Sequence, residues 1–82
     1  MKIKSKPTDQ YFREHRESIG MCIRAFREKK GYSQDDLAEM MQINRSTISK
    51  VETGKLAITI DYLVRFAWYL EFDISVLDKK VV

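Results

Sequence analysis

The segment SQDDLAEMMQINRSTISKVETGK, residues 33–55, has the pattern of a helix, a tight turn and a second helix. Ser33 and Asp36 approximate a capping box, which predicts that the first helix begins there. Asn44 is a good N-cap for the second helix, which we expect over residues 45–53. The rest of the chain must hold this helix pair in place.

The second helix of the pair has an apolar face and a polar face. At roughly 100° per residue, Ile48 and Val51 lie on one side, where they would anchor the helix on a core. The other side presents a guanidinium, an ammonium and hydroxyls, from Arg45, Ser46, Ser49, Lys50 and Thr53. An α-helix fits the major groove of DNA, where such groups donate to base edges or phosphates. A solvated polar face has the same pattern, so the helix alone leaves both interpretations open.

Length, composition and charge limit the class of protein. Eighty-two residues with 44% hydrophobic content make one domain with one core. The net charge is +3, and residues 1–30 hold nine Lys or Arg against four Asp or Glu, which permits contact with a phosphate backbone. The most apolar run, residues 58–70, is too short to span a bilayer. A single cysteine and the absence of a secretory signal predict a cytoplasmic protein without membrane contact.

The sequence indicates no catalytic or metal chemistry. His15 and Cys22 are each the only residue of their type, so there is no nucleophile–base set and no metal-ligand cluster. We expect Cys22 to be a buried, inert thiol. The three glycines are expected at or near helix ends rather than in a phosphate-binding loop. We therefore expect no metal, no cofactor and no enzymatic activity.

The N-terminal part is expected to consist of an arm and a helix. Residues 1–7 are predicted to form a flexible basic arm, and Thr8 is an N-cap signal. The helical pattern that follows fits one long helix, or a short helix and a break near residues 18–20. We favour a main helix over about residues 17–30 with some helix before it, and Gly31 would end the main helix.

The helix expected after Thr59 carries more apolar surface than a small domain needs. Its predicted core stripe consists of Ile60, Leu63, Val64, Ala67 and Leu70. A second, largely aromatic set remains, and we expect a second subunit or partner protein to bury it at Tyr62, Phe66, Trp68 and Tyr69. The alternative is that these are scattered surface aromatics.

The tail FDISV, residues 72–76, alternates apolar and polar residues, which predicts a β-strand. A short fifth helix capped by Asp73 is the alternative. Because a lone strand cannot satisfy its own backbone groups, it would pair with the same strand of a second copy. The expected interface therefore also includes Phe72, Ile74 and Val76, and the dimerisation segment covers about residues 60–82.

Residues 31–55 closely resemble the helix-turn-helix of the Xre/Cro/phage-repressor family, whose pattern runs Gly-x-(Ser/Thr)-Gln-x-x-Leu-Ala, a turn, then Ser-x-x-x-Ile-Ser-x-(Ile/Leu)-Glu-x-Gly. The resemblance covers residues 24–70. It implies an all-α fold, a compact four- to five-helix bundle of lambda-repressor-like type, here with the tail strand pairing across a dimer. Two positions depart from the pattern: Gln42 replaces the usual turn glycine and must adopt a left-handed conformation, and Ile58 replaces the usual proline.

The resemblance also implies roles for individual residues. Arg45, Ser46 and Lys50 would face bases, and Gln34 would contact backbone phosphate from the start of its helix. Thr47, Ser49 and Lys55 would lie near phosphates. Arg27 and Glu52 match a buried ion pair that ties the first helix to the recognition helix.

The sequence therefore predicts a single helix-turn-helix DNA-binding domain over residues 8–82. We expect a sequence-specific transcriptional regulator, most often a repressor, that binds an inverted-repeat operator in double-stranded DNA as a homodimer. The alternative is an antitoxin that binds a toxin protein and autoregulates its operon, because the aromatic set of the last helix could form a toxin-binding surface. The tail also looks like the C-terminal strand through which HipB-like antitoxins dimerise.

Overall fold

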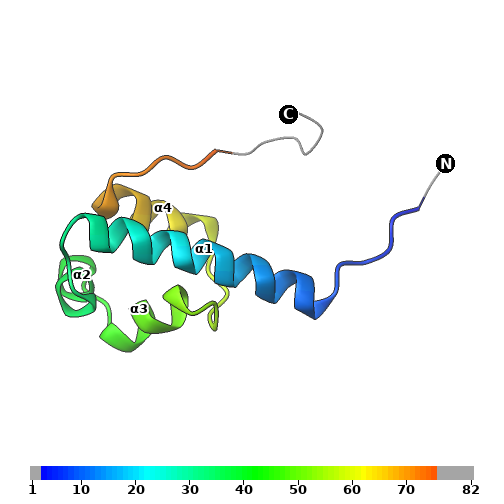
Figure 1. Cartoon of the computed structure of the whole chain (residues 1–82), viewed down its shortest axis with the longest axis horizontal. Coiled ribbons are helices and arrows are strands. Elements are labelled where there is room, and N and C mark those ends of the chain that lie inside the picture. The colour runs from blue at the N-terminus through cyan, green and yellow to red at the C-terminus, as the bar shows by residue number, and fades with distance from the viewer. Residues whose placement is uncertain (1–2, 76–82) are drawn as a thin grey trace.

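The computed structural model describes residues 3–75, and within that range the chain forms four α-helices and no strand. The helices are α1 (Asp9–Lys29), α2 (Gln34–Met41), α3 (Arg45–Glu52) and α4 (Ile60–Leu70). In Figure 1, α1 crosses the middle of the molecule, with α4 on one side of it and the α2–α3 pair on the other. The predicted all-α bundle is confirmed in its four-helix form.

Side-chain caps begin three of these helices. The Thr8 hydroxyl accepts a hydrogen bond from the backbone of Tyr11, and the Thr59 hydroxyl accepts one from Tyr62. Ser33 and Asp36 form a reciprocal capping box, with bonds of 3.0 and 2.8 Å. The backbone N–H of Ser33 lowers the pKa of the Asp36 carboxyl, because the ionised form is the better acceptor. The start of α2 is therefore fixed in the way that the sequence predicts.

The tight turn between α2 and α3 depends on Gln42, whose backbone is left-handed (φ 56°, ψ 47°). This confirms the conformation predicted for the position usually held by glycine. Two residues later, Asn44 has the extended backbone of an N-cap, but its side chain makes no capping bond.

The core lies where all four helices meet. It consists of side chains at most 5% exposed, namely Ile23, Leu37, Ala38, Met41, Ile48, Val51, Phe66 and Leu70. Since Ile48 and Val51 are among them, the apolar face of α3 is anchored and its polar face must point outward.

Contrary to the favoured prediction, α1 is one continuous helix of 21 residues, with no break near residues 18–20. Gly20 is buried in its middle rather than at a helix end, and a Cβ there would lie 2.3 Å from the carbonyl oxygen of Val51. A second close contact follows at Gly54, where a Cβ would lie 2.7 Å from the backbone nitrogen of Glu17. The two glycines let α1 lie directly on the C-terminal end of α3.

The face of α1 that contains Cys22 is also different from the prediction. Cys22 is exposed, so the expected buried thiol is wrong. The buried side of α1 is set by Gly20, Ile23 and Arg27, and Cys22 lies off this line.

Over residues 3–75, no helix is long and apolar enough to cross a membrane.

The predicted core stripe of α4 is confirmed at Leu70, which is buried, and at Leu63, which packs against the core, but it is wrong at Ile60 and Val64. Ile60 and Val64 are 78% and 49% exposed, whereas Phe66 is 0% exposed. The helix is rotated so that Phe66, the largest fully buried side chain, lies in the core, because burying an aromatic ring removes a large apolar area from water. Phe66 therefore cannot contact a partner, which corrects its assignment to an interface. Tyr62 and Tyr69 are half-buried against the same core.

The tail does not form the predicted strand or the alternative fifth helix over residues 72–75. Glu71 ends α4 in a left-handed conformation (φ 58°), and the Phe72 N–H donates to the carbonyl of Ala67. The Phe72 ring then stacks on Phe26 of α1, with ring centroids 4.7 Å apart. Phe72 thus finds its partner within its own chain, and Val76 lies outside the described residues.

The contact at Gly20 yields a prediction for stability. Gly20→Ala should destabilise the fold by about 1–3 kcal/mol, because the added methyl group forces α1 away from the backbone of α3. This loss would outweigh the gain of roughly 1 kcal/mol in helix propensity that alanine brings. Urea unfolding followed by circular dichroism measures the change.

The matched control is Ser18→Ala, at an exposed position of the same helix. This variant should be as stable as the wild type or slightly more so. If Gly20→Ala were equally well tolerated, the close approach of α1 and α3 would not constrain the fold.

Candidate nucleic-acid interface

The outward face of α3 brings together most of the residues that the sequence assigns to DNA contact. Arg45, Ser46 and Lys50 are exposed, and Thr47 and Ser49 are half-buried at its edges. A shallow concave surface is lined by Gln34, Arg45, Ser46, Ser49 and Lys50. The start of α2 and the outer face of α3 thus form one surface that is rich in hydrogen-bond donors.

Under this surface lies an ion pair between α1 and the last residue of α3. The Arg27 guanidinium donates from Nε to Glu52 Oε2 at 2.6 Å and from a terminal nitrogen to Oε1 at 3.0 Å. Both residues are buried, at 7% and 5% exposure. The hydrogen bond to Glu52 raises the pKa of the Arg27 guanidinium, so this guanidinium stays charged. Glu52 is therefore held inside the fold and does not repel phosphate.

The same carboxylate also holds Gln34. The Gln34 amide nitrogen donates to Glu52 Oε1 at 3.1 Å. Since a carboxylate can only accept, the amide oxygen of Gln34 must point the other way, and one N–H remains for another acceptor. The third Arg27 nitrogen donates to the carbonyl of Tyr32 at 2.8 Å, just before α2. One buried cluster thus sets the start of α2 relative to the end of α3.

Sequence reasoning missed one carboxylate on this surface. Asp35, from the first turn of α2, places Oδ1 3.6 Å from the Nε of Arg45, and both side chains are largely exposed. A helical wheel of α3 shows only the side chains of α3, so it could not indicate a carboxylate contributed by α2. An exposed pair at this distance contributes little to stability, but it places a negative charge beside Arg45.

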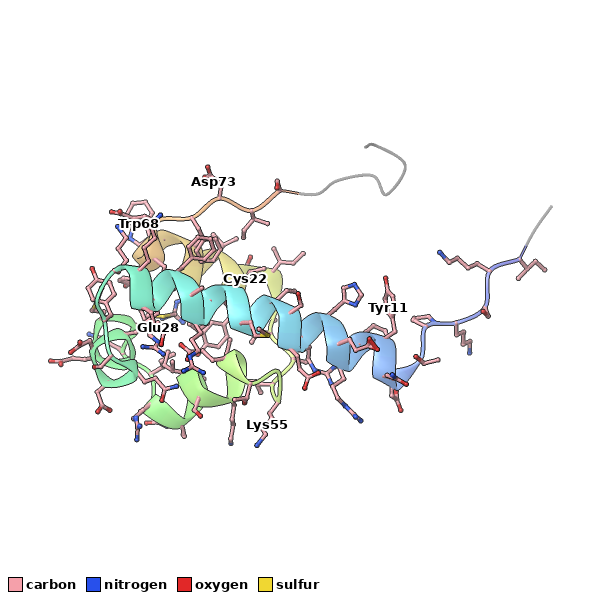
Figure 2. The ribbon with its side chains drawn as sticks, in the orientation of Figure 1. Tyr11, Cys22, Glu28, Lys55, Trp68 and Asp73 are labelled. Carbon is pink, nitrogen blue, oxygen red and sulfur yellow. The ribbon has the colours of Figure 1, made fainter. Side chains whose placement is uncertain are left out.

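Two hydrogen bonds define the end of the surface. The Thr53 hydroxyl donates to the carbonyl of Ser49 at 2.8 Å, so it closes the helix end. The Lys55 N–H donates to the carbonyl of Lys50 at 2.8 Å, and its side chain is exposed. Figure 2 shows Lys55 on the α3 side of the molecule, away from Trp68 and Asp73 on the α4 side.

No group of three or more metal-ligating side chains occurs in the part of the chain that the structure describes. The imidazole Nδ1 of His15 lies 2.9 Å from the backbone carbonyl of Tyr11, within the same helix. The surface therefore has the chemistry of hydrogen bonding and charge, which suits a polyanion.

Comparison with known proteins identifies the arrangement. The Helix-turn-helix family matches residues 23–77, which is more than half of the chain. The fold resembles the crystal structure of the restriction-modification controller protein C.AhdI from Aeromonas hydrophila. The TM-score is 0.68 and the identity 27%, over 73% of this chain and 91% of that one. The matched family is one of regulators rather than enzymes.

Two relatives are described as transcriptional regulatory proteins of the helix-turn-helix type. One, from Pyrococcus furiosus, is 39% identical over 46 residues, which is 56% of this chain and 15% of the relative. The other, from Thermococcus kodakarensis, is 32% identical over 66 residues, which is 76% of this chain and 21% of the relative. The chain thus spans about a fifth or less of either relative.

The buried cluster yields a prediction for stability. Glu52→Ala should lower the free energy of unfolding by about 3 kcal/mol or more, because it leaves the Arg27 charge buried without its partner. Glu28→Ala is the control, since it breaks an exposed pair with Arg24 (3.4 Å) and should cost about 0.5 kcal/mol or less.

A further variant separates burial from charge. Replacing both partners, Arg27→Met with Glu52→Leu, should destabilise less than Glu52→Ala alone, since no uncompensated charge is left in the interior. Equal effects of Glu52→Ala and Glu28→Ala in denaturant unfolding would show that water solvates the pair.

Proposed function

Because the chain belongs to the Xre/Cro-type Helix-turn-helix family, we propose that it is a sequence-specific DNA-binding transcriptional regulator that inserts α3 into the major groove. The observation that carries this proposal is the exposed donor-rich face of α3, held rigidly because Glu52 is locked to Arg27 beneath it. Binding at a promoter would exclude polymerase, so the activity is repression.

The chemistry of the surface assigns roles to its residues. Arg45 is suited to bind guanine O6 and N7 through its two terminal nitrogens, while its Nε faces Asp35. Ser46 and Lys50 are the other base-facing groups. Phosphate contacts are assigned to Gln34, Thr47, Ser49 and Lys55. The remaining N–H of the Gln34 amide supports its assignment, because phosphate oxygens need a donor.

We propose that the regulator acts as a homodimer on an inverted repeat. The outer side of α4 exposes Ile60, Val64 and Trp68, which are four residues apart and so form a single ridge. Trp68 is 78% exposed, and a large apolar ridge of this kind is typical of an interface. This ridge, with Ile74, replaces the largely aromatic set that the sequence indicated. Two α3 helices about 34 Å apart would then enter successive major grooves.

The observations behind an antitoxin function do not favour it. The aromatic surplus that motivated a toxin-binding surface is reduced to Trp68, because Phe66 is in the core and Tyr62 and Tyr69 pack against it. The HipB-like branch is not supported, since the described part of the tail, residues 72–75, forms no strand.

Binding-site selection from random duplexes, followed by affinity measurements, tests whether α3 binds DNA in a sequence-specific way. The selected sites should share one inverted repeat. Arg45→Ala should then weaken binding to that site by about 1–3 kcal/mol and relax the preference at one base pair of each half. Unchanged discrimination would remove Arg45 as a base reader, and the absence of any shared sequence would refute sequence-specific binding.

The dimer is tested by placing a charge on the α4 ridge. Val64→Asp should shift the mass measured by light scattering from dimer to monomer and weaken operator binding. Met21→Asp is the control, because Met21 is 68% exposed on α1 and outside the ridge. A Val64→Asp protein with unaltered mass would rule out pairing through this side of α4.

A further inference from the structure

The first helix is much longer than its packing requires. Helix α1 has 21 residues and α3 has 8, which correspond to about 31 Å and about 12 Å at 1.5 Å per residue. Figure 1 shows the N-terminal half of α1 projecting beyond α3 and α4, with the N-terminal segment continuing outward. The family match begins at residue 23, so this projecting half precedes the matched region.

The contacts of Gly20 and Arg16 define which side of the projecting half faces α3. Gly20 touches the backbone at the end of α3, and one turn earlier Arg16 Nε donates to the carbonyl of Gly54 at 3.1 Å. Arg13 lies three residues before Arg16 and seven before Gly20, so it continues the same face of α1. Arg13 therefore projects from the α3-facing side at a point where α3 has already ended.

The dimensions of the DNA major groove predict what the α3-facing side of the projecting half would contact. Packed helices lie about 8–10 Å apart, and the major groove is about 8.5 Å deep. When α3 lies against the base edges, α1 therefore stands about one groove depth above them. The part of α1 that overhangs α3 is then level with the phosphate ridge beside the groove, and its α3-facing side points at that ridge.

The charges on this overhang fit a polyanion. Arg13 is exposed and has no ion pair among residues 3–75, and the segment before α1 adds exposed Lys4 and Lys6. Asp9 shares the α3-facing side, and Glu17 is packed against Gly54. Over residues 3–16, four cations stand against two carboxylates, from Asp9 and Glu14. The overhang is thus net positive.

We propose that the outer half of α1 and the segment before it form a second DNA contact, which binds backbone phosphates beside the site that α3 reads. Arg13, Lys4 and Lys6 bind phosphate oxygens. Arg16 is a positioning residue, because its bond to Gly54 ties the overhang to the end of α3. This contact rests on the proposed DNA-binding function and extends it beyond the helix-turn-helix.

The test compares salt dependence. In Lys4→Gln/Lys6→Gln/Arg13→Gln, the slope of log affinity against log salt should fall by about two to three, roughly one per lost phosphate contact, while base preference is unchanged. The matched control is Lys4→Gln/Lys6→Gln/Lys29→Gln, which removes the same total charge. Lys29 is sixteen residues after Arg13, which places it on the far side of α1 from α3. A steeper slope in the control than in the Arg13 triple variant supports the contact by Arg13, and equal slopes overturn it. A control slope equal to that of the wild type overturns the contacts by Lys4 and Lys6.

Phosphate ethylation interference locates the contact. The wild type should show a group of phosphates outside the α3 footprint whose ethylation impairs binding, and this group should disappear in the Arg13 triple variant. An identical interference pattern in both proteins refutes the proposal. If Arg45→Ala still relaxes discrimination, only this second contact fails; if the wild type binds no preferred duplex, the proposed function fails with it.

Discussion

The reading surface, formed by the start of α2 and the outer face of α3, depends on the buried ion pair between Arg27 and Glu52. A buried ion pair is poor at stabilising a fold, because desolvation offsets most of the attraction, but it is demanding in geometry. Here the guanidinium joins α1 to the last residue of α3, and the same carboxylate accepts from Gln34 at the start of α2. Three helices must therefore adopt one relative position for the cluster to be satisfied. The cluster also removes a negative charge from a surface that should face phosphates.

Two glycines make that geometry accessible. The bidentate bonds of Arg27 need α1 to lie very close to the end of α3, and a side chain at Gly20 or Gly54 would hold them apart. Gly20 costs α1 about 1 kcal/mol in helix propensity relative to alanine. The helix accepts this cost because its stability comes mainly from packing and not from propensity. The position that looks like a helix breaker in the sequence is therefore a contact point in the fold.

The features that the sequence predicts well are those that depend on a few neighbouring residues. The caps at Thr8, Ser33 and Thr59 and the left-handed Gln42 involve residues at most four positions apart. The features that it predicts poorly depend on distant partners. Both sides of α4 are apolar, so its own sequence does not determine which side is buried. Packing against the other helices buries the side that carries Phe66. The tail alternates like a strand, but Phe72 stacks on Phe26 of α1, which lies 46 residues earlier in the chain. For the same reason Asp35, supplied by a different helix, could not be seen beside Arg45.

The bundle also couples the reading surface to the opposite side of the molecule. Arg65 of α4 donates to the carbonyl of Met41 at the end of α2 with a 2.9 Å bond, and Glu71 pairs with Lys30 at the end of α1. These contacts fix α4 relative to the helix pair, so its exposed ridge and the face of α3 keep a constant separation. If two copies pair through α4, the distance between their α3 helices follows from the packing within one chain. Half-site spacing is then set by the same core that buries Phe66 and Leu37, and substitutions in that core would change the operator geometry as well as the stability.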